Sequence, residues 1–268
     1  MSTFETPQPI TAVIEVVAGT VRLVASDRAD TIVDVRPRDP NRASDVRIAE
    51  QARVHFRNGT LTVSAGRRFI SLGRGGAVDI DVALPTGSRL RASSASAAIH
   101  AEGGYSDCTL ASASGDLAVD SVSGAVKADT ASGAITVQHA DGSITISAAS
   151  GAASIGRLAG NVKFRAASGG LTVTRLSGNL NAQTASGDVV VTEAVTGIVS
   201  VQTGSGDVEV GIPKGTAAQL DLRTHSGSVR NSLAPSDGPA EGDEALVVQV
   251  RTGSGDVIVQ RATADAMS

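Results

Sequence analysis

Aromatic side chains are nearly missing from this sequence, which has four Phe, one Tyr and no Trp among 268 residues. A globular core filled with large aromatic side chains is therefore excluded. Hydrophobic residues still make up 41% of the chain, so it does not fall in the disordered class. We predict that the chain buries small aliphatic side chains in thin, repetitive β packing. The length allows one large domain or two small ones.

Cysteine, strong net charge and long apolar runs are also scarce. The single cysteine, Cys108, cannot form an internal disulfide, and no Cys/His group has zinc-ligand spacing. The net charge of −4 argues against a nucleic-acid partner. No run approaches 18 apolar residues, and the N-terminal segment lacks a basic region and contains Glu15, unlike a signal peptide. We therefore expect a cytoplasmic protein without an integral membrane segment.

Glycine, in contrast, recurs at a fixed period. Seven of the nine glycines in this series follow Ser, and the series runs through Gly115, Gly124, Gly133, Gly142, Gly151, Gly160, Gly169, Gly178 and Gly187. Internal periodicity is the sequence signature of a repeat architecture. We expect these glycines to be the structural repeat positions of the fold.

Each nine-residue unit carries the same apolar pattern around its glycine. The second and fourth residues after the glycine are apolar, as in Leu117 and Val119, and their neighbours are mainly small or polar. This alternation predicts a strand with one buried face, and the Ser-Gly pair predicts a turn. Alternate glycines follow Ala-Ser, so two units form one coil of about 18 residues, with like positions stacked about 4.8 Å apart. Asn161 and Asn179 are then expected to form a side-chain ladder.

The pattern predicts an all-β fold, a parallel β-solenoid or β-helix, that is one continuous structural unit. Exposed ends of a solenoid invite aggregation, so caps are required. Residues 1–92 are expected to form an N-terminal β cap with antiparallel or irregular strands, including a hairpin turn at Asn58-Gly59. Residues 93–261 are expected to form the solenoid, with a regular core at 113–210, degenerate C-terminal coils around an acidic loop at 234–244, and a tail at 262–268.

The repeat units TASGDVVV, TGSGDVEV and TGSGDVIV follow an N-terminal half that contains VRLVASDRADTIVDVRPRDP and GRGGAVDIDVALPTGS. Together these segments resemble the bacterial DUF4097 family, described as "putative adhesin" or "toastrack" β-strand repeat proteins, over residues 4–261. The excess of Arg over Lys resembles the actinobacterial type. The resemblance implies a single-stranded right-handed parallel β-helix and no known enzymatic activity, cofactor or catalytic residue. It also implies a protein partner that is membrane-associated or belongs to a stress response.

Two β-solenoid classes with specific chemistry fit the sequence poorly. Calcium-binding β-rolls need two glycines and a periodic Asp in each unit, whereas here Asp follows the glycine only at Asp116, Asp188, Asp207 and Asp256. Polysaccharide-cleaving enzymes need paired carboxylates on neighbouring coils, but the outward positions are mostly small and uncharged. We interpret Asp116 and Asp120 as solvated charges at strand ends. The sequence therefore predicts no catalytic residue, no cofactor and no metal site.

One segment offers a candidate contact for a partner. Arg67, Arg68 and Arg74 lie between Gly66 and Gly76, with Phe69 among them. The segment is either a plain surface loop or a contact for an anionic partner or a membrane surface.

The resulting hypothesis is a non-enzymatic interaction or scaffold module, a monomer or weak homo-oligomer, that binds an unknown protein. Two alternatives stay open: an exported adhesin or glycan-binding protein, and a self-assembling structural protein.

Overall fold

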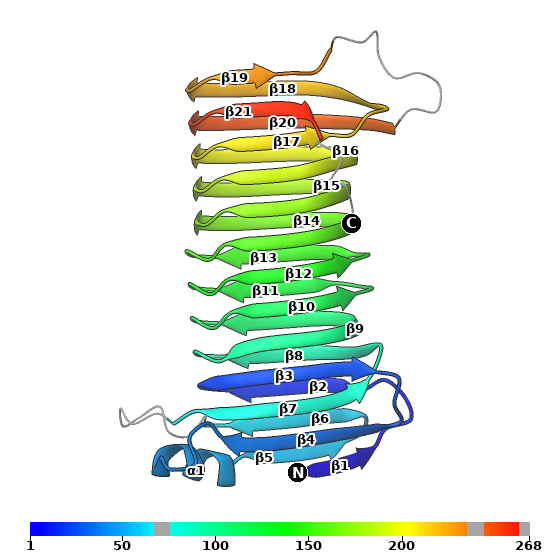
Figure 1. The fold of residues 1–268 in the computed structure, drawn as a ribbon, viewed down its shortest axis with the longest axis vertical. Helices are drawn as coiled ribbons and strands as arrows, with labels where there is room; N and C mark the ends of the chain where they lie inside the picture. The colour runs from blue at the N-terminus through cyan, green and yellow to red at the C-terminus, as the bar shows by residue number, and fades with distance from the viewer. Residues whose placement is uncertain (67–75, 235–243, 263–268) are drawn as a thin grey trace. The chain divides into compact units, whose positions relative to one another are not determined.

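The computed structural model describes residues 1–66, 76–234 and 244–262. These residues contain 21 strands and one short helix, which confirms the prediction of an all-β fold (Figure 1). The chain divides into two compact units, Met1–Val137 and Gln138–Ser268, with the division inside strand β12 (Ile135–Ala140). The domain boundaries expected after residues 92 and 261 stay predictions.

The first unit contains helix α1 (Ala43–Glu50) and eleven complete strands within the described residues. The strands are β1 (Ser2–Glu5), β2 (Thr11–Val16), β3 (Gly19–Ser26), β4 (Asp30–Pro37), β5 (Arg53–Arg57), β6 (Thr60–Ala65), β7 (Val78–Pro85), β8 (Ser88–Ser94), β9 (Ala98–Ser112), β10 (Leu117–Val122) and β11 (Val126–Thr130).

Antiparallel pairing occurs in this unit, as expected for the N-terminal half of the chain. It joins β1 to β4, β4 to β7 and β5 to β6. In the β5–β6 hairpin Arg57 lies opposite Thr60, and the two turn residues Asn58 and Gly59 have φ values of 50° and 70°. Two successive positive φ values are typical of a type I′ turn. The hairpin predicted at Asn58-Gly59 is therefore confirmed.

Strands β2 and β3 lie between strands that come later in the chain. β2 pairs in parallel with both β6 and β8, and β3 pairs in parallel with both β7 and β9. The sequence did not predict this arrangement. β2 and β3, although early in the chain, are therefore paired on both edges by strands that come later.

The second unit begins in β12 and continues through nine further strands in its described part. They are β13 (Ser143–Ala148), β14 (Ala153–Ser168), β15 (Leu171–Ser186), β16 (Val189–Ser205), β17 (Val208–Ile212), β18 (Thr216–Ser226), β19 (Val229–Asn231), β20 (Glu244–Ser254) and β21 (Val257–Arg261).

Parallel neighbours among β13, β14, β15 and the first part of β16 are offset by 18 residues. Ala153 lies opposite Leu171, and Leu171 lies opposite Val189. The offset becomes 19 after Leu176, where the β15–β16 register shifts and Ser177 lies opposite Thr196. This single-residue bulge explains why the nine-residue glycine period slips by one before Gly197.

The last strands of the chain are also inserted out of order. β20 lies between β16 and β18, and β21 pairs in parallel with both β17 and β19 (Figure 1). The strands that precede the C-terminal segment in sequence, β18 and β19, thus form the last rung of the second unit.

The interior is built from small aliphatic side chains, in agreement with the scarcity of aromatic residues. Val, Leu, Ile and Ala make up most of the buried hydrophobic residues, and Phe164 and Tyr105 are the large exceptions. The Asn ladder is present, because Asn179 Nδ2 donates a hydrogen bond to Asn161 Oδ1 at 2.9 Å. Asn179 Oδ1 also accepts a hydrogen bond from the backbone N–H of Ile198 at 3.0 Å.

Candidate functional site

The predicted contact residues Arg67, Arg68, Phe69 and Arg74 lie outside the described residues. The chain enters this segment from β6 through Gly66, which has a φ of +88°. A Cβ atom at this glycine would lie 3.1 Å from Val17 Cγ2, so the turn packs closely against the residue that follows β2. The described residues that flank the predicted contact in sequence are Gly66, directly after β6, and Gly76, where a Cβ atom would lie 2.6 Å from the Ser44 backbone.

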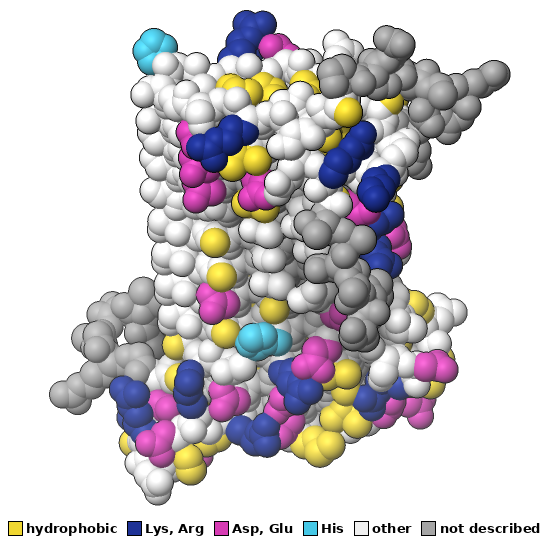
Figure 2. Space-filling model, turned by 45° about the horizontal axis from the view of Figure 1, so that its top comes forward, with side chains coloured by type: hydrophobic (Ala, Val, Ile, Leu, Met, Phe, Trp, Pro, Cys, Tyr) yellow, Lys and Arg dark blue, Asp and Glu magenta, His cyan; other side chains and the backbone are white. Residues whose placement is uncertain are grey.

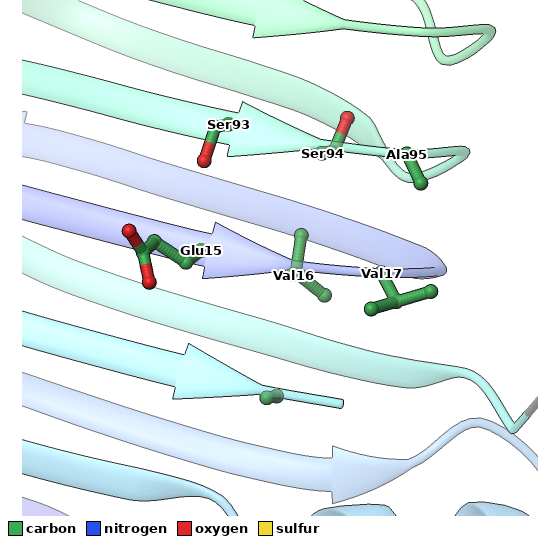
Figure 3. A pocket seen from close by; sticks show the side chains of 7 residues that line it. Glu15, Val16, Val17, Ser93, Ser94 and Ala95 are labelled. Carbon is green, nitrogen blue, oxygen red and sulfur yellow. The ribbon is translucent and has the colours of Figure 1, made fainter. Parts of the chain in front are cut away.

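A small hollow of about 160 Å³ lies at this end of the strands (Figure 3). In the parallel ladder Val16 is opposite both Ala65 and Ser94, the last residues of β6 and β8. Three neighbouring strands therefore end at one level. The hollow is lined by Glu15, Val16, Val17, Ala65, Ser93, Ser94 and Ala95.

The walls of the hollow are held by the turns that follow these strands. The backbone N–H groups of Val17, Ala95 and Ser96 donate to the carbonyl oxygens of Ala65, Val16 and Val17, respectively. The Ser94 hydroxyl donates to the Ala97 carbonyl oxygen at 2.9 Å. These bonds occupy backbone groups at the rim, so side chains give the hollow its chemistry. Valine and alanine provide an apolar floor, and Glu15 and Ser93 add a carboxylate and a hydroxyl group.

The size of the hollow limits its ligand. Pockets that enclose small-molecule substrates usually measure about 300–1,000 Å³. A volume of about 160 Å³ accommodates roughly one amino-acid side chain. The hollow is therefore too small to enclose a metabolite of ordinary size.

The described part of the chain contains no candidate metal site. Residues 1–66, 76–234 and 244–262 contain no group of three or more His, Cys, Asp and Glu side chains with metal-site geometry. The four histidines, His55, His100, His139 and His225, are all exposed on separate strands.

Cys108 and Tyr105 are both buried in β9, with exposed fractions of 1% and 2%. Burial, with a smaller contribution from the negative charge of Asp107, raises the pKa of the Cys108 thiol to about 12. The thiol is therefore protonated at neutral pH and unreactive as a nucleophile. Burial also raises the pKa of Tyr105, and its hydroxyl oxygen has no hydrogen-bond partner among the described residues.

The aspartates of the Ser-Gly-Asp units have a structural role that the sequence analysis missed. In unit one, Asp116 Oδ1 accepts a hydrogen bond from the Ala134 N–H at 2.9 Å, and Asp120 Oδ2 accepts one from the Gly103 N–H at 3.2 Å. They are thus exposed, as predicted, but they also hold the backbone of adjacent strands. The available signal was the Asp that directly follows Ser-Gly at positions 116, 188, 207 and 256.

In the second unit, hydrogen bonds of the same kind link a series of aspartates. Asp188 Oδ1 accepts from the N–H of Asp207, Asp207 Oδ1 accepts from the N–H of Asp256, and Asp256 Oδ1 accepts from the N–H of Ser228, each at 2.8 Å. The hydrogen bond from the Ser228 N–H, helped by the Ser228 hydroxyl and Arg230, lowers the pKa of Asp256. These carboxylates therefore join successive turns.

The sequence of the chain is matched over residues 13–260 by the family described as Toastrack DUF4097. No curated protein matches the chain. The described residues include no helix that is both long and apolar enough to cross a membrane.

Similar solved structures cover almost the whole chain at low identity. A "putative adhesin" of Bacteroides fragilis is 10% identical over 96% of this chain and 95% of its own, with a TM-score of 0.48. A "putative lipid binding protein" of Parabacteroides distasonis is 13% identical over 98% and 96%, with a TM-score of 0.47. A "putative cell adhesion protein" of Clostridium sporogenes is 9% identical over 97% and 98%, with a TM-score of 0.25.

Proposed function

Because the chain belongs to the Toastrack DUF4097 family, as its repeat motifs predicted, we propose that it is a non-enzymatic protein-interaction module on a right-handed parallel β-solenoid. The parallel offset of 18 residues along β13, β14 and β15 supports coils of that length. The module works in the cytoplasm and needs no cofactor.

The hollow at the ends of β2, β6 and β8 is the contact site in this proposal. The observation that carries it is the match between its volume, about 160 Å³, and a single side chain on an apolar floor. Interface anchors of this kind bury one side chain in a small pocket and surround it with polar contacts.

The predicted basic segment begins two residues after Ala65, which lines the hollow. Arg67, Arg68 and Arg74 add positive charge next to the anchor site in sequence. The partner protein therefore has an apolar anchor residue flanked by acidic groups. These groups are carboxylates of the partner itself or, for a membrane-associated partner, phosphates.

Site-specific photo-crosslinking in the native cell tests this assignment. A photoreactive amino acid at Ser93, which lines the hollow, is compared with one at Arg91, two residues earlier on the same face of β8. We expect one dominant partner adduct at residue 93 that is much weaker at residue 91.

The triple substitution Arg67→Ser, Arg68→Ser and Arg74→Ser should reduce the adduct at residue 93 about tenfold, because it removes three attractive charges. Equal adducts at both positions, or an adduct that the triple substitution leaves unchanged, would contradict the proposed contact site.

A further inference from the structure

The last rung of the second unit has one free edge. In the part of the chain that the structure describes, β18 pairs only with β20, and β19 pairs only with β21. The opposite edge of β18 therefore presents backbone N–H and C=O groups to which no described strand bonds. Such an edge is a template for another strand.

Within residues 1–66, 76–234 and 244–262, no further rung covers the hydrophobic interior at this end. Val199, Val248 and Leu220 are successive members of one column, and Val250 and Leu222 belong to the next. Val248 and Val250 are fully buried, whereas Leu220 and Leu222 are half-buried.

The apolar side chain of β19, which pairs with β21, is also less buried than its neighbour. Val257 is fully buried and its neighbour Val229 is 45% exposed. Figure 2, in which the top of Figure 1 comes forward, shows hydrophobic side chains at the surface of this end beside charges of both signs.

Three of the usual protections of an edge strand are missing from β18, namely Lys, Pro and a bulge. Natural edges carry Lys or Pro, a bulge or an inward-pointing charge. The strand reads TAAQLDLRTHS, contains neither Lys nor Pro, and pairs with β20 without a bulge. Its two charges, Asp221 and Arg223, form an ion pair with Arg223 Nε 3.0 Å from Asp221 Oδ1.

We infer that the free edge of β18 pairs in antiparallel fashion with β18 of a second copy, about a two-fold axis at Leu222. Because side chains alternate between the faces of a strand, only every second register keeps the leucine side chains of both copies facing the interior. With Leu222 on the axis, Asp221 of each copy lies opposite Arg223 of the other.

The two neighbouring allowed registers lack this complementarity. Moving the axis to Asp221 places the two Asp221 side chains opposite each other, and moving it to Arg223 does the same for the arginines. Like charges directly opposite in a β ladder are destabilising. Charge therefore selects the register centred on Leu222, and the exposed ends of both leucine columns are covered in the same step.

Sedimentation equilibrium of the full chain over a range of concentrations tests the inference. The wild-type mass should rise from 26.8 kDa towards twice that value. Asp221→Arg and Arg223→Asp each place like charges across the axis, and each should weaken association about tenfold or more. An equimolar mixture of the two variants restores opposite charges at both contacts, so we expect it to form a heterodimer as tightly as the wild type.

Glu193→Arg is the matched control. It makes the same charge change in an outward ion pair with Arg175, away from β18, and should leave the association unchanged. A wild-type chain that stays monomeric at every concentration would overturn the inference and leave the edge to a strand of another protein. Single variants that associate like the wild type, or a mixture that does not recover, would also overturn it. Recovery in the mixture shows that each variant is folded.

Discussion

Gly178 is a position where the structure predicts a large effect of adding one methyl group. It lies opposite Gly160 in the β14–β15 ladder and has a φ of +138°. A Cβ atom there would lie 2.0 Å from the Gly160 carbonyl oxygen. The obstacle is backbone, so the two strands must separate by about 1 Å or more from their normal spacing of about 4.8 Å.

The expected effect of Gly178→Ala follows from two contributions. Holding a non-glycine residue at this φ costs about 1–3 kcal/mol. Separating the strands weakens about two ladder hydrogen bonds, each contributing about 1 kcal/mol. We therefore expect the free energy of unfolding to fall by about 3–5 kcal/mol, a large fraction of the 5–15 kcal/mol typical of a folded domain.

Gly215→Ala provides a matched control in the same unit. Gly215 also has a positive φ, +86°, but a Cβ atom there meets nothing within 4 Å. Gly215→Ala should therefore lower the free energy of unfolding by only about 1–2 kcal/mol. Urea unfolding followed by far-UV circular dichroism measures both variants, with the slope of each transition compared to the wild type. If the two variants lose equal stability, the close approach of the strands at Gly178 is not what requires glycine.

Three further predictions concern the carboxylates and the buried thiol. Asp207→Ala removes the acceptor of the Asp256 N–H and should lower the free energy of unfolding by about 1 kcal/mol. Asp207→Asn should lower it less, because the amide oxygen still accepts the hydrogen bond. Equal losses for the two variants in urea unfolding would refute this role of Asp207. The pKa of Asp107 is lowered by the hydrogen bond from the Ala125 N–H and then by Arg89, and that of Asp256 by Ser228. The stabilising contribution of these two carboxylates is therefore present above the unfolded pKa of about 3.9 and is lost as the pH falls through the lower folded pKa. Asp107→Asn removes one of the two contributions. In acid titrations its free energy of unfolding should therefore decline less steeply below about pH 4 than that of the wild type. With a pKa of about 12, Cys108 should not react with a thiol reagent at pH 8 until the protein unfolds, and rapid labelling of the native protein would contradict its burial.

Local features of the fold were predicted because short-range chemistry decides them. The two positive φ values at Asn58-Gly59 belong to a two-residue hairpin whatever surrounds it. Alternating apolar residues predicted strands with one buried face, and the distance of 18 residues between Asn161 and Asn179 predicted their ladder. In each case the sequence itself contains the spacing that the structure repeats.

The candidate hollow could not be predicted in this way. Its lining comes from the ends of β2, β6 and β8, and consists of Val, Ala and Ser residues that are common throughout the chain. The arginine segment stands out by composition, but its contact role stays a prediction. The Asp residues after the glycines were visible in sequence, yet their backbone partners appear only when neighbouring strands are placed side by side.

The sequence by itself determined the β class, the strand period and the family, because these depend on a repeated pattern of residue types. Only the tertiary structure decided which strands are neighbours. β2 and β3 lie between later strands, and β20 separates β16 from β18. The physical reason is that every strand presents the same alternation of apolar and polar residues, so the pattern allows many neighbours, and the choice among them rests on the packing of whole rungs and the closure of their ends.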